Sequence, residues 1–89
     1  MKITVDISMY PLDQDYIPPI KAFIRRLRNY PGLELITNQL STQIAGDYDN
    51  VTAALNACMA ESMVTEGRVV FVARYLNAGL EIGRLPRID

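Results

Sequence analysis

The first ten residues alternate between apolar and polar side chains, and this pattern constrains the fold more than any other feature. The apolar members are Ile3, Val5, Ile7 and Met9, and the polar members are Thr4, Asp6, Ser8 and Tyr10. Successive side chains of a strand point to opposite faces of its sheet, so a strand is predicted over residues 2–10 with its apolar face toward a core. The strand should end at Pro11, because proline cannot donate to the hydrogen-bond ladder.

A second segment, residues 40–46, alternates in the same way. Its inward side chains are predicted to be Leu40, Thr42 and Ile44, and its outward ones Ser41, Gln43 and Ala45. The outward faces of both strands thus carry Ser, Thr, Asp, Gln and Tyr without the Lys and Glu of ordinary solvated surface. We expect a small polar molecule or another subunit to lie there.

Apolar residues at three- and four-residue spacing predict two helices. The first begins near residues 16–19 and ends before Pro31-Gly32. Its buried stripe is predicted to be Ile17, Ile20, Phe23, Ile24 and Leu27. The second follows Asp47 and Asp49, two candidate N-caps, and ends at Gly67. Its predicted stripe is Val51, Ala54, Leu55, Cys58, Met59, Ser62 and Met63.

Two further strands are predicted, over residues 33–38 and 68–76. The element order is therefore βαββαβ, an α+β ferredoxin-like fold with a four-stranded antiparallel sheet and both helices on one face. We assign residues 1–77 to this domain and residues 78–89, which show no period, to a C-terminal arm or loop.

The last strand completes the face of the sheet that no helix covers. Val69, Phe71, Ala73 and Tyr75 are predicted to face the core, and Val70, Val72, Arg74 and Leu76 to face outward. This surface is too apolar at one edge for bulk water, so a second subunit should cover it and leave a lined pocket. A homo-oligomer, a dimer or a tetramer, is expected.

Four polar residues of this face have two interpretations each. Asp6 forms a cross-strand ion pair with Arg74, or it offers negative charge to a cationic ligand. Tyr10 is a solvated rim aromatic or a stacking wall for a flat heterocycle. Ser8 and Ser41 are incidental polar residues or positioned donors and acceptors.

Composition removes several classes of function. The net charge of −1 gives no basic patch for nucleic acid. Without histidine, and with Cys58 as the single cysteine on an apolar stripe, neither a metal cluster nor a nucleophile–base pair can be assembled, so we expect no enzyme and no cofactor. No apolar run could span a membrane and no signal peptide is visible, which predicts a cytoplasmic protein.

The motifs Ser8-Met9-Tyr10-Pro11-Leu12, Asp15-Tyr16 and Leu40-Ser41-Thr42-x-Ile44-x-Gly46 resemble the YkoF-like family of thiamine and hydroxymethylpyrimidine binding domains over roughly residues 3–77. The resemblance implies a ferredoxin-like domain that binds the pyrimidine of thiamine without chemistry. It puts Ser41 and Thr42 in one binding motif, whereas alternation turns Thr42 inward. Gly79-Leu80 stands where the family often has Cys-Pro-Gly.

Together these lines predict a non-catalytic module that binds thiamine or hydroxymethylpyrimidine on the open sheet face, at a subunit interface. Tyr10 would stack on the ring, Ser8 and Ser41 would bond its nitrogens, and Asp6 would offset positive charge. The predicted site is Asp6, Ser8, Tyr10, Ser41, Thr42 and Gln43. The alternative is a structural or regulatory oligomerisation domain with no small-molecule ligand.

Overall fold

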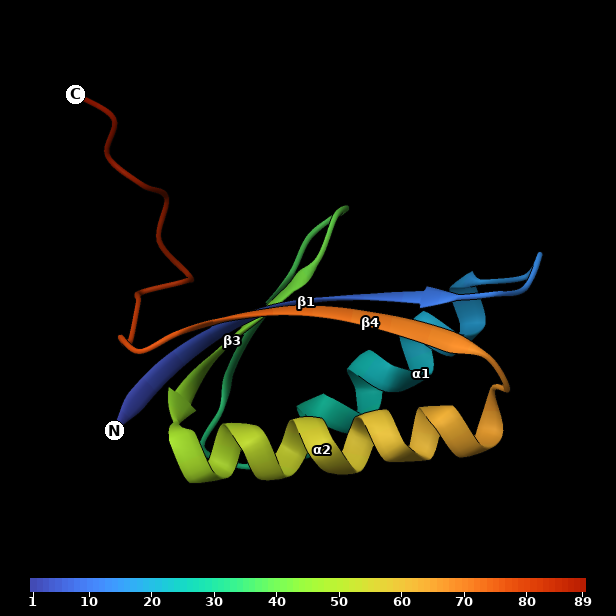
Figure 1. Cartoon of the computed structure of the whole chain (residues 1–89). Coiled ribbons are helices and arrows are strands. Elements are labelled where there is room, and N and C mark those ends of the chain that lie inside the picture. Colours follow the sequence, from blue (N-terminus) through green and yellow to red (C-terminus); the bar gives the residue numbers. More distant parts are fainter.

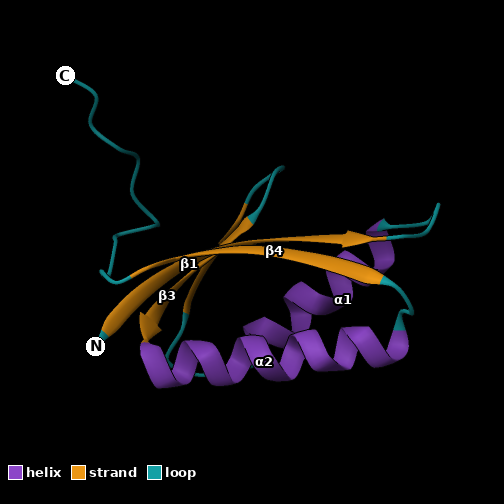
Figure 2. Cartoon of the chain, viewed as in Figure 1, coloured by secondary structure: helices purple, strands orange, loops and turns teal.

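The computed structural model describes all residues, 1–89, and has the predicted element order. The elements are β1 (Lys2–Pro11), α1 (Ile17–Arg28), β2 (Glu34–Thr37), β3 (Thr42–Asp47), α2 (Tyr48–Thr65) and β4 (Val69–Leu76). The strands form one antiparallel sheet in the order β2-β3-β1-β4. Both helices lie on the same side of this sheet (Figures 1 and 2). The ferredoxin-like fold predicted from the alternation is confirmed.

Strand β1 lies in the centre of the sheet, and its register brings the polar residues of three strands together. Asp6 lies opposite Gln43 of β3 on one side and opposite Arg74 of β4 on the other. Residue spacing along β1 therefore places the carboxylate of Asp6 in the middle of the open face, as alternation requires.

The core lies between the sheet and the two helices. It contains the four apolar residues of β1, Ile44 of β3 and six residues of the helices, all almost fully excluded from water: Phe23, Leu27, Val51, Ala54, Leu55 and Cys58. The rings of Phe23 in α1 and Phe71 in β4 pack at 5.1 Å between centroids. An ion pair of 3.3 Å between Arg26 and Glu61 joins the two helices at the surface.

The termini of α2 follow the predicted signals with one difference. Asp47 occupies the N-cap position, but its carboxylate makes no cap hydrogen bond and lies 3.4 Å from the Lys2 ammonium. The Tyr48 N–H instead donates to the carbonyl of Met1 at 2.9 Å. After the helix, Gly67 has a φ of +74°, a left-handed conformation that glycine adopts without strain.

Four side chains predicted to be buried are exposed: Ile17, Leu40, Met63 and Tyr75. Ile17 is the first residue of α1, and Met63 lies in the last turn of α2. Leu40 is part of a loop, since β3 begins only at Thr42. Tyr75 lies near the end of an edge strand, where a neighbouring strand covers only one side.

Residues after β4 form an arm that crosses the open face from β4 toward β2. The Thr4 hydroxyl donates to the carbonyl of Ala78 at 2.8 Å and accepts from the N–H of Leu80 at 2.9 Å. A Cβ at Gly79 would lie 3.1 Å from the Lys2 Cβ, and one at Gly83 would lie 3.3 Å from Glu34 Oε1. Thr4, which was predicted to lie on the open face of the sheet, is therefore buried under the arm. Beyond the arm, the last residues extend away from the sheet (Figure 1).

Candidate functional site

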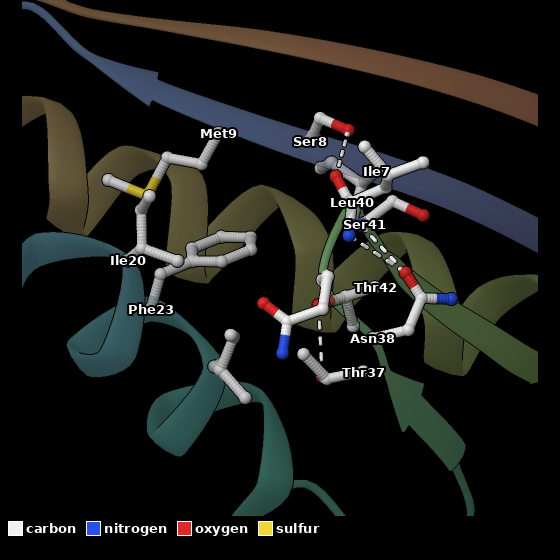
Figure 3. A pocket seen from close by; sticks show the side chains of 12 residues that line it. Ile7, Ser8, Met9, Ile20, Phe23, Thr37, Asn38, Leu40, Ser41 and Thr42 are labelled. Atoms are coloured by element: carbon white, nitrogen blue, oxygen red, sulfur yellow. Dashed lines mark hydrogen bonds between the residues drawn. The ribbon is translucent and has the colours of Figure 1, made fainter. Parts of the chain in front are cut away.

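A cavity of about 110 Å³ lies between α1 and the loop that joins β2 to β3 (Figure 3). Its apolar wall consists of side chains from β1 and α1: Ile7, Met9, Ile20, Phe23 and Ile24. Its other wall is polar and comes mostly from the loop and the strand ends beside it: Ser8, Thr37, Asn38, Gln39, Ser41 and Thr42. Leu40 completes the lining. Apolar walls with a few directed polar groups are typical of small-molecule sites.

Asn38 holds the loop in shape. Its side-chain oxygen accepts hydrogen bonds from the N–H groups of Leu40 at 3.0 Å and Ser41 at 3.1 Å. Its own N–H donates to the carbonyl of Ser41 at 3.0 Å. An Asn side chain that bonds the backbone two and three residues later stabilises a tight turn, so the polar wall of the cavity is built on an ordered loop.

Thr42 points to the helix side of the sheet, as alternation predicts, and is nevertheless part of the cavity wall. Its hydroxyl lies 3.0 Å from that of Thr37 on the adjacent strand. In such a pair one hydroxyl donates and the other accepts, so the accepting hydroxyl keeps a proton for another partner. The inward orientation of Thr42 is therefore compatible with a role in binding.

None of the residues that line the cavity carries an ionisable side chain. A buried charge would need a partner that this cavity does not offer. Its volume is close to the roughly 150 Å³ of an engineered protein cavity that binds benzene. The cavity therefore suits one neutral six-membered ring better than a charged or larger group.

A second depression, of about 300 Å³, lies on the open face beside the arm. We call it the groove; it is lined by Thr4, Asp6, Gln43, Arg74, Tyr75, Leu76, Leu80 and Ile82. Here Asp6 Oδ2 accepts hydrogen bonds from Arg74 Nη2 at 2.7 Å and Nε at 3.2 Å. The cross-strand ion pair considered from the sequence is thus formed.

Asp6 also accepts a hydrogen bond of 2.6 Å at Oδ1 from the hydroxyl of Ser41. This bond, together with the bonds and the charge of Arg74, holds the pKa of Asp6 below its ordinary value, although partial burial acts in the opposite direction. Asp6 is therefore a carboxylate that can accept hydrogen bonds but cannot donate one.

The structure divides five of the six predicted site residues between these two places. Ser8, Ser41 and Thr42 line the cavity, whereas Asp6 and Gln43 line the groove. Tyr10 lines neither; it lies opposite Val70 near the C-terminal end of β1 with 53% of its surface exposed.

Sequence reasoning missed the contributions of Asn38 and Gln39, which it assigned to a strand end and a strand connection. The signal was present at Asn38, because Asn is a typical turn residue whose side chain bonds the backbone two residues later.

Other reactive groups lie apart from both places. Cys58 is buried in α2, and burial raises the pKa of its thiol. No group of three or more His, Cys, Asp or Glu side chains could hold a metal ion. Neither α1 nor α2 combines the length and the hydropathy that a membrane-spanning helix needs.

Solved structures share this fold at low sequence identity. A protein of Streptococcus pneumoniae matches with a TM-score of 0.81 at 19% identity, over 92% of this chain and 91% of its own. A hypothetical protein of Methanocaldococcus jannascii matches at 0.76 and 23% identity, over 86% of this chain and 80% of its own. A proposed thiamine biosynthesis/salvage protein of Thermotoga maritima matches with a TM-score of 0.76 at 16% identity, over 97% of this chain and 90% of its own.

No curated protein sequence matches the chain. A sequence model does match: that of the YKOF-related family, over residues 2–76, which span β1 through the end of β4. The match includes both strand motifs on which the resemblance rests and every residue of the cavity wall. The chain belongs to the YKOF-related family.

Proposed function

We propose that the protein binds a flat pyrimidine ring, that of thiamine or hydroxymethylpyrimidine, in the cavity between α1 and the β2–β3 loop, without chemical conversion. The observation that carries this proposal is the composition of the cavity: apolar side chains on one side and neutral hydrogen-bonding groups on the other. Family membership and the likeness to the proposed thiamine biosynthesis/salvage protein of Thermotoga maritima support the same ligand class.

The absence of charge in the cavity defines how thiamine would bind. An aminopyrimidine ring is neutral and can lie against Phe23 and Ile24 while its nitrogens meet the hydroxyls opposite. The cationic thiazolium, or a phosphate attached to it, would stay at the mouth in water, because its desolvation inside would be uncompensated. The sequence predicted a ligand on the open face; the cavity fits better because three of the predicted residues, Ser8, Ser41 and Thr42, lie there opposite an apolar wall.

We also propose that recognition occurs without catalysis, on the basis of the same lining. No ionisable side chain lies among the lining residues. The one carboxylate bonded to a lining hydroxyl, that of Asp6 on Ser41, is paired with Arg74 and has a lowered pKa, which makes it a poor general base. We expect turnover of thiamine and its phosphates to stay at background, and reproducible hydrolysis abolished by one point substitution would contradict this.

The open face favours a second role, the formation of a homo-oligomer. Val70, Val72 and Leu76 are exposed on β4, and Tyr10 is exposed beside them on β1. Light scattering at micromolar concentration should give at least a dimer, and Val72→Lys should shift it toward monomer. A wild type that is strictly monomeric over this range would contradict the role.

Calorimetry with hydroxymethylpyrimidine, thiamine and its phosphates tests the binding proposal. Loss of one hydrogen-bonding group against a buried ligand costs about 1–3 kcal/mol, so Thr42→Val should weaken binding roughly 5- to 150-fold. Thr65→Val removes an equivalent hydroxyl from the exposed end of α2 and should leave affinity unchanged. Absence of binding by the wild type, or equal affinity in both variants, would refute the cavity as the site.

A further inference from the structure

The serine hydroxyls beside the cavity differ in how firmly their protons are held. The Ser41 proton is donated to Asp6 at 2.6 Å, and Asp6 is held in turn by Arg74 at 2.7 Å. The Ser8 proton is donated to the carbonyl of Leu40 at 3.3 Å, at an exposed position. A short bond to a carboxylate is roughly twice as strong as a bond between neutral groups, so only Ser41 has a fixed orientation.

This fixed orientation determines what Ser41 can offer. A hydroxyl has one proton and two lone pairs, and the Ser41 proton is already used by Asp6. Asp6 cannot reverse the bond, because an ionised carboxylate has no proton to donate. Ser41 can therefore only accept a hydrogen bond from a bound molecule.

We infer that Asp6, held by Arg74 from the groove, is a positioning residue that fixes Ser41 as an acceptor, so that the cavity selects rings bearing an exocyclic amine over the same rings bearing a carbonyl. The amine would donate to Ser41 Oγ. A carbonyl at that position would put oxygen lone pairs against oxygen lone pairs, and relief would require breaking the bond to Asp6. The inference rests on the proposed function and states which class of ring the cavity prefers.

The other hydroxyls of the wall are compatible with this choice. In the Thr37–Thr42 pair, the accepting hydroxyl keeps its proton and can donate to a ring nitrogen. An aminopyrimidine offers this combination, an amine donor next to a ring nitrogen acceptor. A pyrimidinone offers the reverse, a carbonyl next to an N–H.

The experiment compares two probes, 4-amino-5-hydroxymethyl-2-methylpyrimidine and the corresponding pyrimidin-4-one, by calorimetry. The wild type should prefer the amine by about 10- to 100-fold, the effect of one mispaired buried polar group. Asp6→Asn keeps the shape of the side chain but can donate its amide N–H to Ser41, which frees the serine proton. In this variant the preference should fall to a few-fold, and affinity for the pyrimidinone should rise above the wild-type value.

Two further variants complete the test. Ser41→Ala removes the discriminating acceptor and should also lose the preference, which keeps the inference testable if Asp6→Asn fails to fold. Asp47→Asn alters another strand aspartate that pairs with a basic residue, Lys2, and should retain the full preference.

The outcomes separate the two proposals. If Asp6→Asn and Ser41→Ala weaken both probes equally and leave their ratio unchanged, Asp6 is only structural and the inference is overturned, while the cavity remains the binding site. If the wild type binds the two probes equally well, the inference is likewise overturned. If it binds neither probe, the proposed function fails and the inference fails with it.

Discussion

The cavity and the groove lie close together around Ser41, yet they differ in every property that decides what they can bind. The cavity is lined only by neutral side chains and lies against the core, whereas the groove contains an ion pair and an arm added after the last strand. Asp6 has a quarter of its side chain exposed and Arg74 more than four fifths. The ion pair of Asp6 and Arg74 thus lies in the groove, where water reaches it, and not in the cavity.

This difference shows how a small domain can use charge without burying it. A carboxylate inside the cavity would be costly unless paired. Placed in the groove, it is solvated, paired with Arg74, and still bonded through Ser41 to the cavity wall. The Asp6 carboxylate therefore acts on the cavity only through its hydrogen bond to the Ser41 hydroxyl, while its charge stays outside the cavity.

The largest expected difference between the cavity and the groove comes from truncating one aromatic side chain that lines each, Phe23 in the cavity and Tyr75 in the groove. Phe23→Ala should lower the free energy of unfolding by about 3–5 kcal/mol, because Phe23 is buried and packs on Phe71. Tyr75→Ala should cost about 0.5 kcal/mol or less, because Tyr75 is exposed. Urea unfolding measures both values. Similar costs for the two variants would show that the groove is as integral to the core as the cavity.

An intermediate effect is expected for the arm, which forms one side of the groove. Thr4→Val removes two hydrogen bonds to the arm while keeping the size of the side chain, and should lower the free energy of unfolding by about 1–2 kcal/mol. Pyrimidine affinity should not change, since Thr4 does not line the cavity. A variant that loses affinity would break the separation between the two places.

The smallest expected effect is the change with pH of the stability that Asp6 contributes. Because the pKa of Asp6 is lowered in the folded state, the contribution of its carboxylate is present above the ordinary aspartate pKa of about 3.8 and is lost as pH falls through the lower folded value. The wild type should exceed Asp6→Asn in unfolding free energy by about 1 kcal/mol at pH 5–7. Urea unfolding should show this difference shrinking below pH 4, and a constant difference down to pH 3 would contradict the assignment.

Periodicity was sufficient to predict the fold because burial follows it so closely here. In β1 every second side chain from Ile3 to Met9 is buried, and the same rule turns Ile44 and Thr42 inward in β3. The rule failed at Tyr75 and at Thr4 for opposite reasons. Tyr75 is exposed because it lies near the end of an edge strand. Thr4 is buried because the arm packs over it, and the sequence of the arm has no periodic pattern that predicts this contact.

The candidate site could be predicted only in part. Ser8, Ser41 and Thr42 were identified as residues, but alternation assigned them to opposite faces and gave no reason to expect one shared cavity. That cavity exists because the four residues between β2 and β3 form a turn on Asn38 beside α1, and their distance from the helix depends on three-dimensional packing. Tyr10 looked suitable by chemistry, yet it does not line the cavity, although its neighbour Met9 does. Successive side chains of a strand point to opposite faces, so Tyr10 lies on the other face of the sheet from Met9.

The bonds between Thr4 and the arm join residues 74 and 76 positions apart, so they close a loop of nearly the whole chain. Loop-closure entropy makes such contacts dependent on prior assembly of the strands between them. The arm should therefore dock last during folding and open first during native fluctuations. The Leu80 amide, whose partner is the Thr4 hydroxyl, would exchange its proton each time the arm lifts, independently of unfolding of the sheet beneath it.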